Sequence, residues 1–340
     1  MRPDMVLALI LNPRKWFGSA VMLCAGISVM MSCAGRSAVA AGGDAPAVDC
    51  DALRDSIESI VSGVDGEVGV ALIVNGHDTV AVNDRDVYPL MSVFKLHQAV
   101  ALCHDFDIRG VSVDTVLHVR RVDLDPDTWS PMLKEHTASR FDIPVSALMR
   151  YTLMQSDNNA SNIMFDRLLS VAETDSFIAT LVPRDGFRLA VRESDMHHDH
   201  ALSYENHSSP VSTAVLVDRL FNDSILSSES REFICDALRN CTTGVDRISA
   251  PLADKEGIVI AHKTGSGYVN GEGRLIAHND AAHVVLPDGT SYTLVVFVKD
   301  FAGNETEASS LISRISSVVY GFVSSYPTHP SPDSKGMQAC

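Results

Sequence analysis

The spacing of apolar residues divides the chain into strand-like and helix-like stretches. Val68 to Val74 is an apolar run that ends at Asn75-Gly76, a strong hairpin turn signal, and residues 79–82 form the predicted return strand. From about residue 92 to residue 240 the apolar positions recur at spacings of three and four, as in amphipathic helices. The helices predicted in that region span 92–104, 145–154, 158–170, 212–222 and 229–239.

The two patterns also occur on either side of this helical region. Residues 51–61 carry their apolar side chains on one helical face, which predicts a helix before the first strand. The strands predicted after residue 257 span 258–262, 281–286 and 292–298. A last helix is predicted from seven apolar residues on one side, Ala308, Leu311, Ile312, Ile315, Val318, Val319 and Phe322.

These elements predict an α/β domain combined with an all-α domain. The helix and strands at both ends imply one discontinuous α/β domain, residues 50–88 and 242–325, with an all-helical domain inserted at 89–241. Residues 184–210, within the insert, have neither period, and a loop of that length inside a compact domain is usually functional. A cleft between the domains is the expected site, and residues 326–340 are expected to form a flexible tail.

Composition and charge narrow the classes of function. The chain has 340 residues, 46% of them hydrophobic, which is enough to bury a large core and excludes a disordered chain. The formal net charge of −16 repels phosphate backbones, so nucleic acid is not an expected partner. No run of about 18 apolar residues follows the N-terminal segment, so no later membrane span is predicted.

The N-terminal segment has the pattern of a secretory signal. Arg14 and Lys15 precede an apolar stretch of small residues that ends at Met31, within a signal peptide predicted over residues 1–40. Cleavage at about 32/33 would leave Cys33 as a lipidated first residue, and cleavage at 40/41, after Ala38-Val39-Ala40, would leave no anchor. The protein is therefore expected to be exported to the periplasm, with Cys33 as a candidate lipid anchor.

Export makes disulfides permissible, but the cysteines do not form a framework. After cleavage five remain, an odd number at irregular spacing, and no C-x-x-C pair supports a zinc knuckle or a redox motif. We expect mostly buried or free thiols, with Cys235 and Cys241 as the only nearby pair. The five are Cys50, Cys103, Cys235, Cys241 and Cys340.

Two short motifs place hydroxyl and basic groups at helix starts. Ser92 and Lys95 share one helix face, so the lysine can take the proton of a nucleophilic serine if its pKa is lowered. Ser156-Asp157-Asn158 directly precedes a predicted helix. This triplet can cap the helix and also aim a hydroxyl and an amide into a cleft.

A third motif, Lys263-Thr264-Gly265-Ser266-Gly267, ends the strand predicted from Ile258. A cation, two hydroxyls and bare glycine backbone on a strand edge can receive a carboxylate and a carbonyl oxygen. The alternative is a glycine-rich strand end with a solvated lysine. The three motifs together, each in order and each on its element, support the first interpretation.

With these motifs the chain resembles a class A serine β-lactamase, one of the penicillin-recognising serine enzymes, over roughly residues 50–325. The resemblance implies an antiparallel sheet flanked by the terminal helices, with a helical domain inserted. It implies hydrolysis of the β-lactam amide of penicillins and cephalosporins through an acyl-serine intermediate. It further implies a monomer that needs no metal, no cofactor and no obligate protein partner.

The resemblance also assigns roles within the motifs. Ser92 matches the acylated nucleophile, Lys95 the lysine that helps to deprotonate it, and Ser156 the hydroxyl that relays a proton to the leaving nitrogen. Asn158 matches the amide that holds the substrate's side-chain carbonyl. The backbone N–H groups of Ser92 and Ser266 match the oxyanion hole. The residues that match the group receiving the substrate carboxylate are Lys263, Thr264 and Ser266.

The long loop should supply the base that frees the acyl-serine, and Glu193 and Glu205 are the candidates. The segment resembles the PER-type, extended-spectrum subgroup, in which the glutamate is followed four residues later by His and the loop ends in Asn. His197 and Asn206 fit that pattern, so we choose Glu193. Asn162 matches the asparagine that braces the loop.

Asn206 cannot supply the negative end of the family's usual Arg–Asp pair across this loop. Its neutral side chain favours a roomier loop that admits bulky oximino-cephalosporins. Trp129 matches the aromatic wall of the cleft in the same subgroup. For a second arginine at the substrate carboxylate, Arg247 fits best and Arg274 is the alternative.

Three other functions stay open on the sequence. A penicillin-binding DD-peptidase or a non-enzymatic β-lactam sensor would not need Glu193, and a glutaminase-like relative would not need the Lys-Thr-Gly strand. The run His197-His198-Asp199-His200 does not match the H-x-H-x-D-H spacing of the zinc-dependent β-lactamases, so no metal is expected.

Overall fold

The computed structural model describes residues 50–325, all of which belong to one compact unit. The predicted signal peptide, both of its cleavage sites and Cys33 lie outside the described residues, as do the predicted tail and Cys340. The division of the chain into a discontinuous α/β domain and a helical insert stays a prediction.

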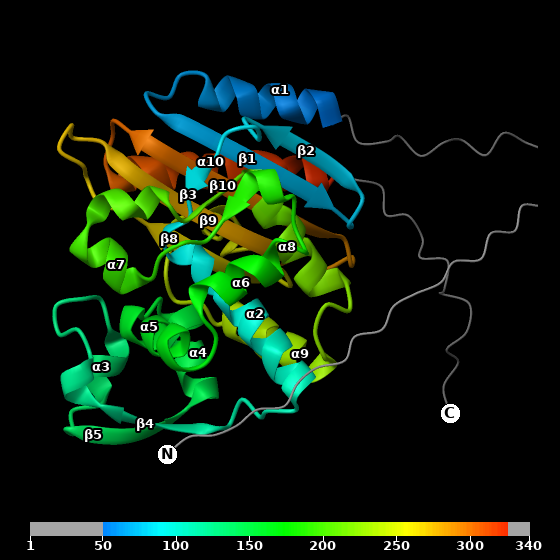
Figure 1. The fold of residues 1–340 in the computed structure, drawn as a ribbon. Helices are drawn as coiled ribbons and strands as arrows, with labels where there is room; N and C mark the ends of the chain where they lie inside the picture. The colour runs from blue at the N-terminus through cyan, green and yellow to red at the C-terminus, as the bar shows by residue number, and fades with distance from the viewer. Residues whose placement is uncertain (1–49, 326–340) are drawn as a thin grey trace, which may run out of the picture. The chain divides into compact units, whose positions relative to one another are not determined.

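The centre of the fold is a five-stranded sheet in the order β2-β1-β10-β9-β8, with every neighbouring pair antiparallel (Figure 1). The predicted hairpin joins β1 to β2 through residues 75–77, and Asn75 and Gly76 in this short turn both have positive φ. The antiparallel sheet predicted from the family resemblance is therefore confirmed. Its strands are β1 (Glu67–Val74), β2 (Asp78–Val82), β8 (Val259–Ser266), β9 (Leu275–Val285) and β10 (Ser291–Phe301).

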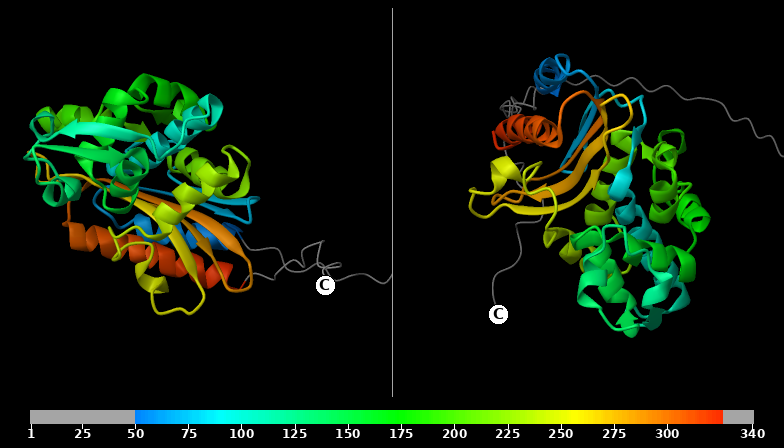
Figure 2. Two further views of the ribbon diagram at one scale, coloured as in Figure 1. Left: turned by 90° about the horizontal axis from the view of Figure 1, so that it is seen from below. Right: turned by 90° about the vertical axis from the view of Figure 1, so that its left-hand side faces the viewer.

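The two terminal helices, α1 (Cys50–Val61) and α10 (Glu305–Val323), cover one face of this sheet (Figure 2). Their apolar sides meet the outer sheet residues in one buried cluster that includes Ile57, Leu72 and Ile315. The flanking arrangement expected for the terminal helices is therefore confirmed.

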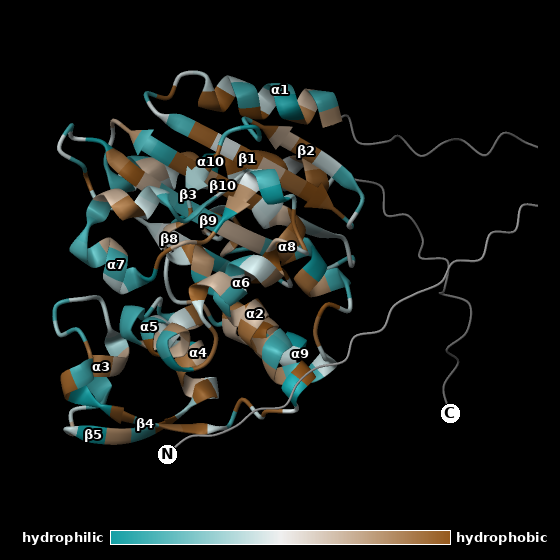
Figure 3. Ribbon diagram, viewed as in Figure 1, coloured by the Kyte–Doolittle hydropathy of each residue, from teal (hydrophilic) through white to brown (hydrophobic). Residues whose placement is uncertain are grey.

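The opposite face of the sheet packs against the helical region. Helix α8 (Pro210–Asn222) lies against β1, β9 and β10, and α2 (Phe94–Arg109) runs through the centre of the helices (Figure 1). Apolar colouring gathers on the sheet strands and on α2 (Figure 3). The remaining helices are α3 (Pro131–Glu135), α4 (Val145–Met154), α5 (Asn158–Arg167), α6 (Val171–Ile178), α7 (Glu193–His198) and α9 (Ser228–Arg239).

Short elements that the hydrophobic pattern did not predict complete the fold. A two-stranded sheet joins β4 (Val116–Arg120) to β5 (Arg140–Pro144). A three-stranded sheet in the order β3-β7-β6 combines β3 (Tyr88–Pro89), β6 (Phe187–Arg188) and β7 (His207–Ser208). The 3-10 helices are η1 (Met91–Val93), η2 (Arg121–Asp123), η3 (Arg184–Gly186), η4 (His200–Tyr204) and η5 (Ala250–Leu252).

The pairing of β6 with β7 joins the two ends of the predicted functional loop, here called its neck. Residues 189–206 extend from these two strands. The loop is not irregular throughout, because it holds α7 and η4. Within the described part of the chain, Cys235 and Cys241 are not joined by a disulfide. No helix among residues 50–325 is long and apolar enough to cross a bilayer.

Candidate active site

A cleft of about 530 Å³ brings the three motifs and the long loop together. It lies where the edge strand β8 meets the start of α2, the start of α5 and the start of α7. The motif residues that line it are Ser92, Ser156, Asn158, Thr264 and Ser266, joined by Glu193 from the loop.

Ser92 lies in the short helix η1, which continues into α2. The preceding residue, Met91, has a φ of 44°, a sparsely populated conformation for a residue with a side chain. Strand β8 presses directly on this turn, because a Cβ on Gly265 would lie 2.5 Å from the Leu90 carbonyl oxygen. The glycine of the Lys-Thr-Gly motif is therefore needed so that the strand can reach the backbone of the serine turn.

Lys95 joins the first two sequence motifs and the long loop at one nitrogen. Its side chain is fully buried, and Nζ lies 2.9 Å from Ser92 Oγ, 2.8 Å from the Ser156 carbonyl oxygen and 2.6 Å from Asn158 Oδ1. The fourth contact is an ion pair of 2.8 Å with Glu193 Oε1. A buried ammonium is tolerated here because it is paired and surrounded by acceptors.

Asp157 holds the second motif in place. It caps α5 by accepting from Ala160 N at 2.8 Å, and it also accepts from Met132 N and the Ser130 hydroxyl. Burial raises the pKa of this carboxyl, and these hydrogen bonds act against the shift. With Asp157 fixed, Ser156 takes a positive φ of 61° and turns toward the cleft, which explains how one triplet both caps a helix and serves a site.

The third motif places a second lysine beside the Ser156 hydroxyl. Lys263 Nζ donates to Ser156 Oγ at 3.1 Å and to the Thr264 carbonyl oxygen at 2.8 Å, and its side chain is fully buried. Burial lowers the pKa of Lys263 to about 7. Ser156 therefore contacts both lysines: its hydroxyl accepts from Lys263, and its carbonyl oxygen accepts from Lys95. In this position the hydroxyl can pass a proton.

The structure separates the two arginine candidates. Arg247 is buried beside β8 and donates to Ser266 Oγ at 2.6 Å and to the Gly265 carbonyl oxygen at 3.1 Å. Burial lowers the pKa of this guanidinium. Arg274 instead binds Asp65 and the Asp300 carbonyl oxygen.

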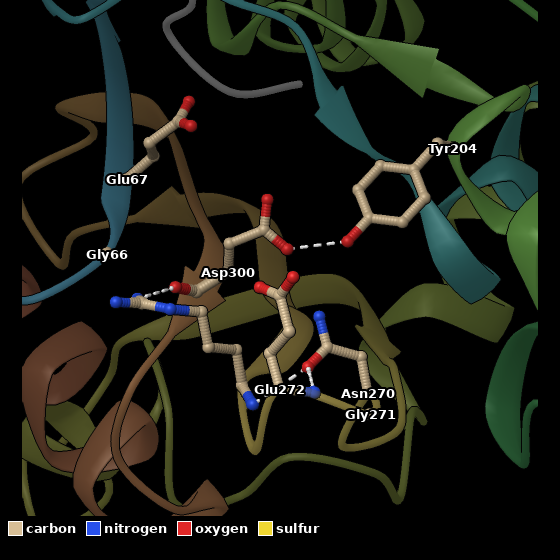
Figure 4. Close-up of a pocket in the computed structure, with 8 residues that line it drawn as sticks. Gly66, Glu67, Tyr204, Asn270, Gly271, Glu272 and Asp300 are labelled. Carbon is tan, nitrogen blue, oxygen red and sulfur yellow. Dashed lines mark hydrogen bonds between the residues drawn. The ribbon is translucent and has the colours of Figure 1, made fainter.

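Arg274 belongs to a different cavity of about 690 Å³ (Figure 4). There the Tyr204 hydroxyl points at Asp300 and donates to its carboxylate at 2.5 Å, and the side chains of Glu67 and Glu272 stand nearby. None of the three motifs lines this cavity, so Arg274 does not reach the cleft and Arg247 does.

The loop carries Glu193 at the first position of α7, with its Oε1 3.1 Å from Ser92 Oγ. Asn162 Oδ1 accepts from Ser194 N at 3.3 Å and so contacts the loop beside the glutamate. Glu205 faces away from the serine and pairs with Arg188 at 2.9 Å at the partly exposed neck. The sequence reasoning missed this arginine–carboxylate pair, because it looked for the negative partner at Asn206.

Asn206 holds the loop through its amide and not through a charge. Its Oδ1 accepts from Ala190 N at 2.8 Å and from Val191 N at 3.0 Å, while its Nδ2 donates to the Val191 carbonyl oxygen at 2.8 Å. A carboxylate could accept the first two bonds but could not donate the third. The asparagine thus satisfies three backbone groups that this loop conformation leaves open.

Trp129 and His197 lie at the periphery of the site. Trp129 is 55% exposed, lines the cleft and donates from its indole N–H to the Gln155 carbonyl oxygen at 2.9 Å. His197 is exposed, 3.7 Å from an Asp125 carboxylate oxygen, and does not line the cleft. Among residues 50–325 no group of three or more His, Cys, Asp and Glu side chains is placed to hold a metal ion.

Two further lining residues carried no sequence signal. Thr243 Oγ1 lies 2.6 Å from Thr264 Oγ1, and Glu305 begins α10 at the same end of the cleft. Together with Arg247 they form the end of the site that faces the Lys-Thr-Gly strand. The cleft as a whole can activate a serine, relay a proton through a second hydroxyl and receive an anionic group.

Comparison with known proteins gives one consistent result. The model of the beta-lactamase enzyme family matches residues 52–323. A β-lactamase of Phocaeicola vulgatus is 56% identical over 271 residues, covering 80% of this chain and 84% of that protein. The extended-spectrum β-lactamase PER-1 of Pseudomonas aeruginosa is 31% identical, covering 79% and 87%. The crystal structure of TLA-3 extended-spectrum β-lactamase superposes with a TM-score of 0.77 at 30% identity, covering 81% of this chain and 99% of that one.

Proposed function

The chain belongs to the class A β-lactamase family, and from this premise we propose that it opens β-lactam rings through an acyl intermediate on Ser92. The observation that carries the proposal is the contact of Ser92 Oγ with Lys95 Nζ at 2.9 Å and with the carboxylate of Glu193 at 3.1 Å. A penicillin-binding peptidase or a β-lactam sensor would need the first contact but not the second.

Acylation begins when Ser92 Oγ attacks the carbonyl carbon of the strained amide and loses its proton. Glu193 Oε1 accepts a hydrogen bond from the Ser92 hydroxyl and can take this proton without rearrangement, whereas Lys95, which donates to Ser92 Oγ, would first have to give up a proton of its own. The ring C–N bond breaks, and the leaving nitrogen takes a proton from the Ser156 hydroxyl. Lys263, 3.1 Å from Ser156 Oγ, returns a proton to that oxygen, and the base passes the proton of Ser92 to solvent, so that Ser156 is again a hydroxyl and Glu193 a carboxylate before deacylation.

Deacylation requires a water molecule to attack the ester on Ser92. Glu193 is the one carboxylate among the described residues that contacts Ser92 Oγ. It therefore takes the proton of the attacking water, and the ester C–O bond breaks to return Ser92. Its ion pair with Lys95 fixes the carboxylate in that position while the ester is present.

Raising the pH above about 7 is expected to weaken substrate binding. Lys263 is an ammonium below its lowered pKa of about 7 and a neutral amine above it, so its attraction for the substrate carboxylate disappears as pH rises. We expect KM to rise between pH 7 and pH 9 by up to about tenfold per pH unit, because the protonated fraction falls by that factor. KM measured across this range for the wild type and for Lys263→Arg, which keeps its charge, tests this. A flat wild-type profile would contradict the assignment.

We further propose a PER-type subgroup with extended-spectrum activity, exported to the periplasm and acting as a monomer. The loop held by the neutral Asn206 and the exposed wall at Trp129 support a site open to bulky acyl side chains. The export proposal rests on the predicted signal segment.

Turnover of a chromogenic cephalosporin by the mature protein is the direct test. We expect many product molecules per protein molecule, because Glu193 frees Ser92 after each cycle. Release of at most one equivalent would overturn the proposal in favour of a penicillin-binding protein or a sensor. The same assay with oximino-cephalosporins tests the substrate range: hydrolysis of penicillin G but none of cefotaxime or ceftazidime would contradict the extended spectrum.

A further inference from the structure

A second cluster of ionisable side chains lies behind the cleft and takes no part in the mechanism above. Cys241 follows the end of α9 and is a half-buried residue with a free thiol. His262 and Asp280 lie on the adjacent strands β8 and β9, almost fully buried, with His262 Nδ1 3.0 Å from an Asp280 carboxylate oxygen. The imidazole of His262 lies close enough to the Cys241 thiol to lower its pKa, so Cys241, His262 and Asp280 form one cluster.

Asp280 is fixed independently of the histidine, because its carboxylate also accepts from Ile248 N at 3.1 Å. Burial alone would lower the pKa of His262, but the charge of Asp280 and the hydrogen bond to it raise that pKa to about 10. The imidazole is therefore a cation at neutral pH. This is the arrangement in which a carboxylate orients a histidine and the histidine activates a nucleophile.

The thiol itself has the environment of a reactive cysteine. Burial opposes its ionisation, but the proximity and charge of His262, with Lys263 next along the strand, lower the pKa of Cys241 to about 7. Arg247 is a further cation near the sulfur. At Cys103 and Cys235 burial prevails, and it raises the pKa of Cys103 to about 12 and that of Cys235 to about 11. A thiolate in a cationic, partly exposed setting is the nucleophilic form of cysteine.

Cys241 also contacts a residue that lines the cleft. Its Sγ lies 3.4 Å from Thr243 Oγ1, which in turn contacts Thr264 Oγ1 at 2.6 Å. The residue after Thr243 also packs tightly against strand β8, because a Cβ on Gly244 would clash with Thr264 Cγ2. A group added to the sulfur is therefore expected to disturb Thr243, which contacts Thr264 in the cleft.

From this geometry we propose that Cys241 is a thiol-modification site that reacts with low-molecular-weight disulfides, and that the adduct weakens substrate binding at the Lys-Thr-Gly end of the cleft. The Cys241 thiolate attacks one sulfur of the reagent, a new S–S bond forms to Cys241, and the reagent's own S–S bond breaks. The released thiolate takes a proton from solvent, so no further oxidant is required.

The modification does not depend on the proposed hydrolysis, whereas the effect on substrate binding does. Intact protein is therefore treated with glutathione disulfide at pH 7, and adducts are assigned to residues by peptide mass mapping. We expect Cys241 to be modified at least tenfold faster than Cys103 and Cys235, since the thiolate fraction of the other two is far smaller. Equal rates for the three thiols in the folded protein, or no adduct on Cys241, would overturn the site.

Two alanine variants separate the site from general effects of losing a thiol. Cys241→Ala should lose the fast adduct and keep its turnover. Cys235→Ala, the matched control in the adjacent helix, should keep both.

The modified wild type is expected to show KM raised at least threefold, kcat within twofold, and full recovery on reduction by a thiol. Fast modification without a change in KM would overturn the link to the cleft and leave the proposed hydrolysis intact. A protein that never hydrolyses β-lactams would still give the labelling result.

Discussion

Exchange of Glu193 for glutamine is expected to convert the protein from a catalyst with many turnovers into one that is acylated once and stays acylated. Glutamine has nearly the same shape as glutamate, so it can still fill the space beside Ser92 and Lys95, from which Glu193 Oε1 lies 3.1 and 2.8 Å away. It cannot take a proton from water. A positioned general base contributes about 10²–10⁴-fold, and we expect deacylation to slow by about that factor.

The measurement is the intact mass of the variant after mixing with one equivalent of a cephalosporin. We expect a stable adduct of one substrate on nearly every Glu193→Gln molecule, whereas the wild type should show none after the substrate is consumed. Glu205→Gln is the matched control, because Glu205 lies in the same loop but pairs with Arg188 at the neck. Wild-type turnover in Glu193→Gln, or a trapped adduct in Glu205→Gln, would show that the base is assigned wrongly.

Replacement of Ser92 by alanine is expected to abolish both the adduct and the turnover. The Oγ atom is the nucleophile in the proposed mechanism, and no other described hydroxyl touches both Lys95 and Glu193. Loss of a nucleophile that acts as a unit with its base costs roughly 10⁴-fold or more in turnover. The proposed substrate-binding groups at Asn158 and Lys263 remain, so Ser92→Ala should still bind an intact β-lactam.

Binding by calorimetry and adduct formation by mass spectrometry check the two parts of this result. The double variant Ser92→Ala with Glu193→Gln should be no slower than Ser92→Ala alone, because the base has no serine ester left to hydrolyse. An adduct on Ser92→Ala, mapped to Ser156 or to any other residue, would refute Ser92 as the nucleophile.

The hydrophobic pattern predicted the limits of helices and strands most accurately where the buried faces of these elements are apolar. The hairpin at Asn75-Gly76 and the last helix appear in the structure close to their predicted limits. Strand β9 begins at Leu275, six residues before the strand expected from the sequence. Its missing half contains the buried polar side chains His278, Asn279 and Asp280, whose partners come from other elements, so the pattern of apolar residues could not reveal it.

The sequence by itself determined the three motifs, their order, and which element carries each of them. Those properties are local: an i, i+3 pair on a helix, a capping triplet before a helix, and a glycine that lets a strand approach closely. They identified the fold class and the family resemblance, and the comparisons confirm both at that level.

Only the tertiary structure decided which residues complete the cleft. Glu193 meets Ser92 across 101 positions of sequence, Arg247 turns into the cleft whereas Arg274 binds elsewhere, and Asn206 holds the loop with an amide. Each of these contacts depends on how whole elements pack and on which backbone groups are left to be satisfied. The family resemblance pointed to Glu193 and Arg247, but the residues beside them do not establish these contacts, because a long-range contact is fixed by the free energy of the complete fold and not by local preference.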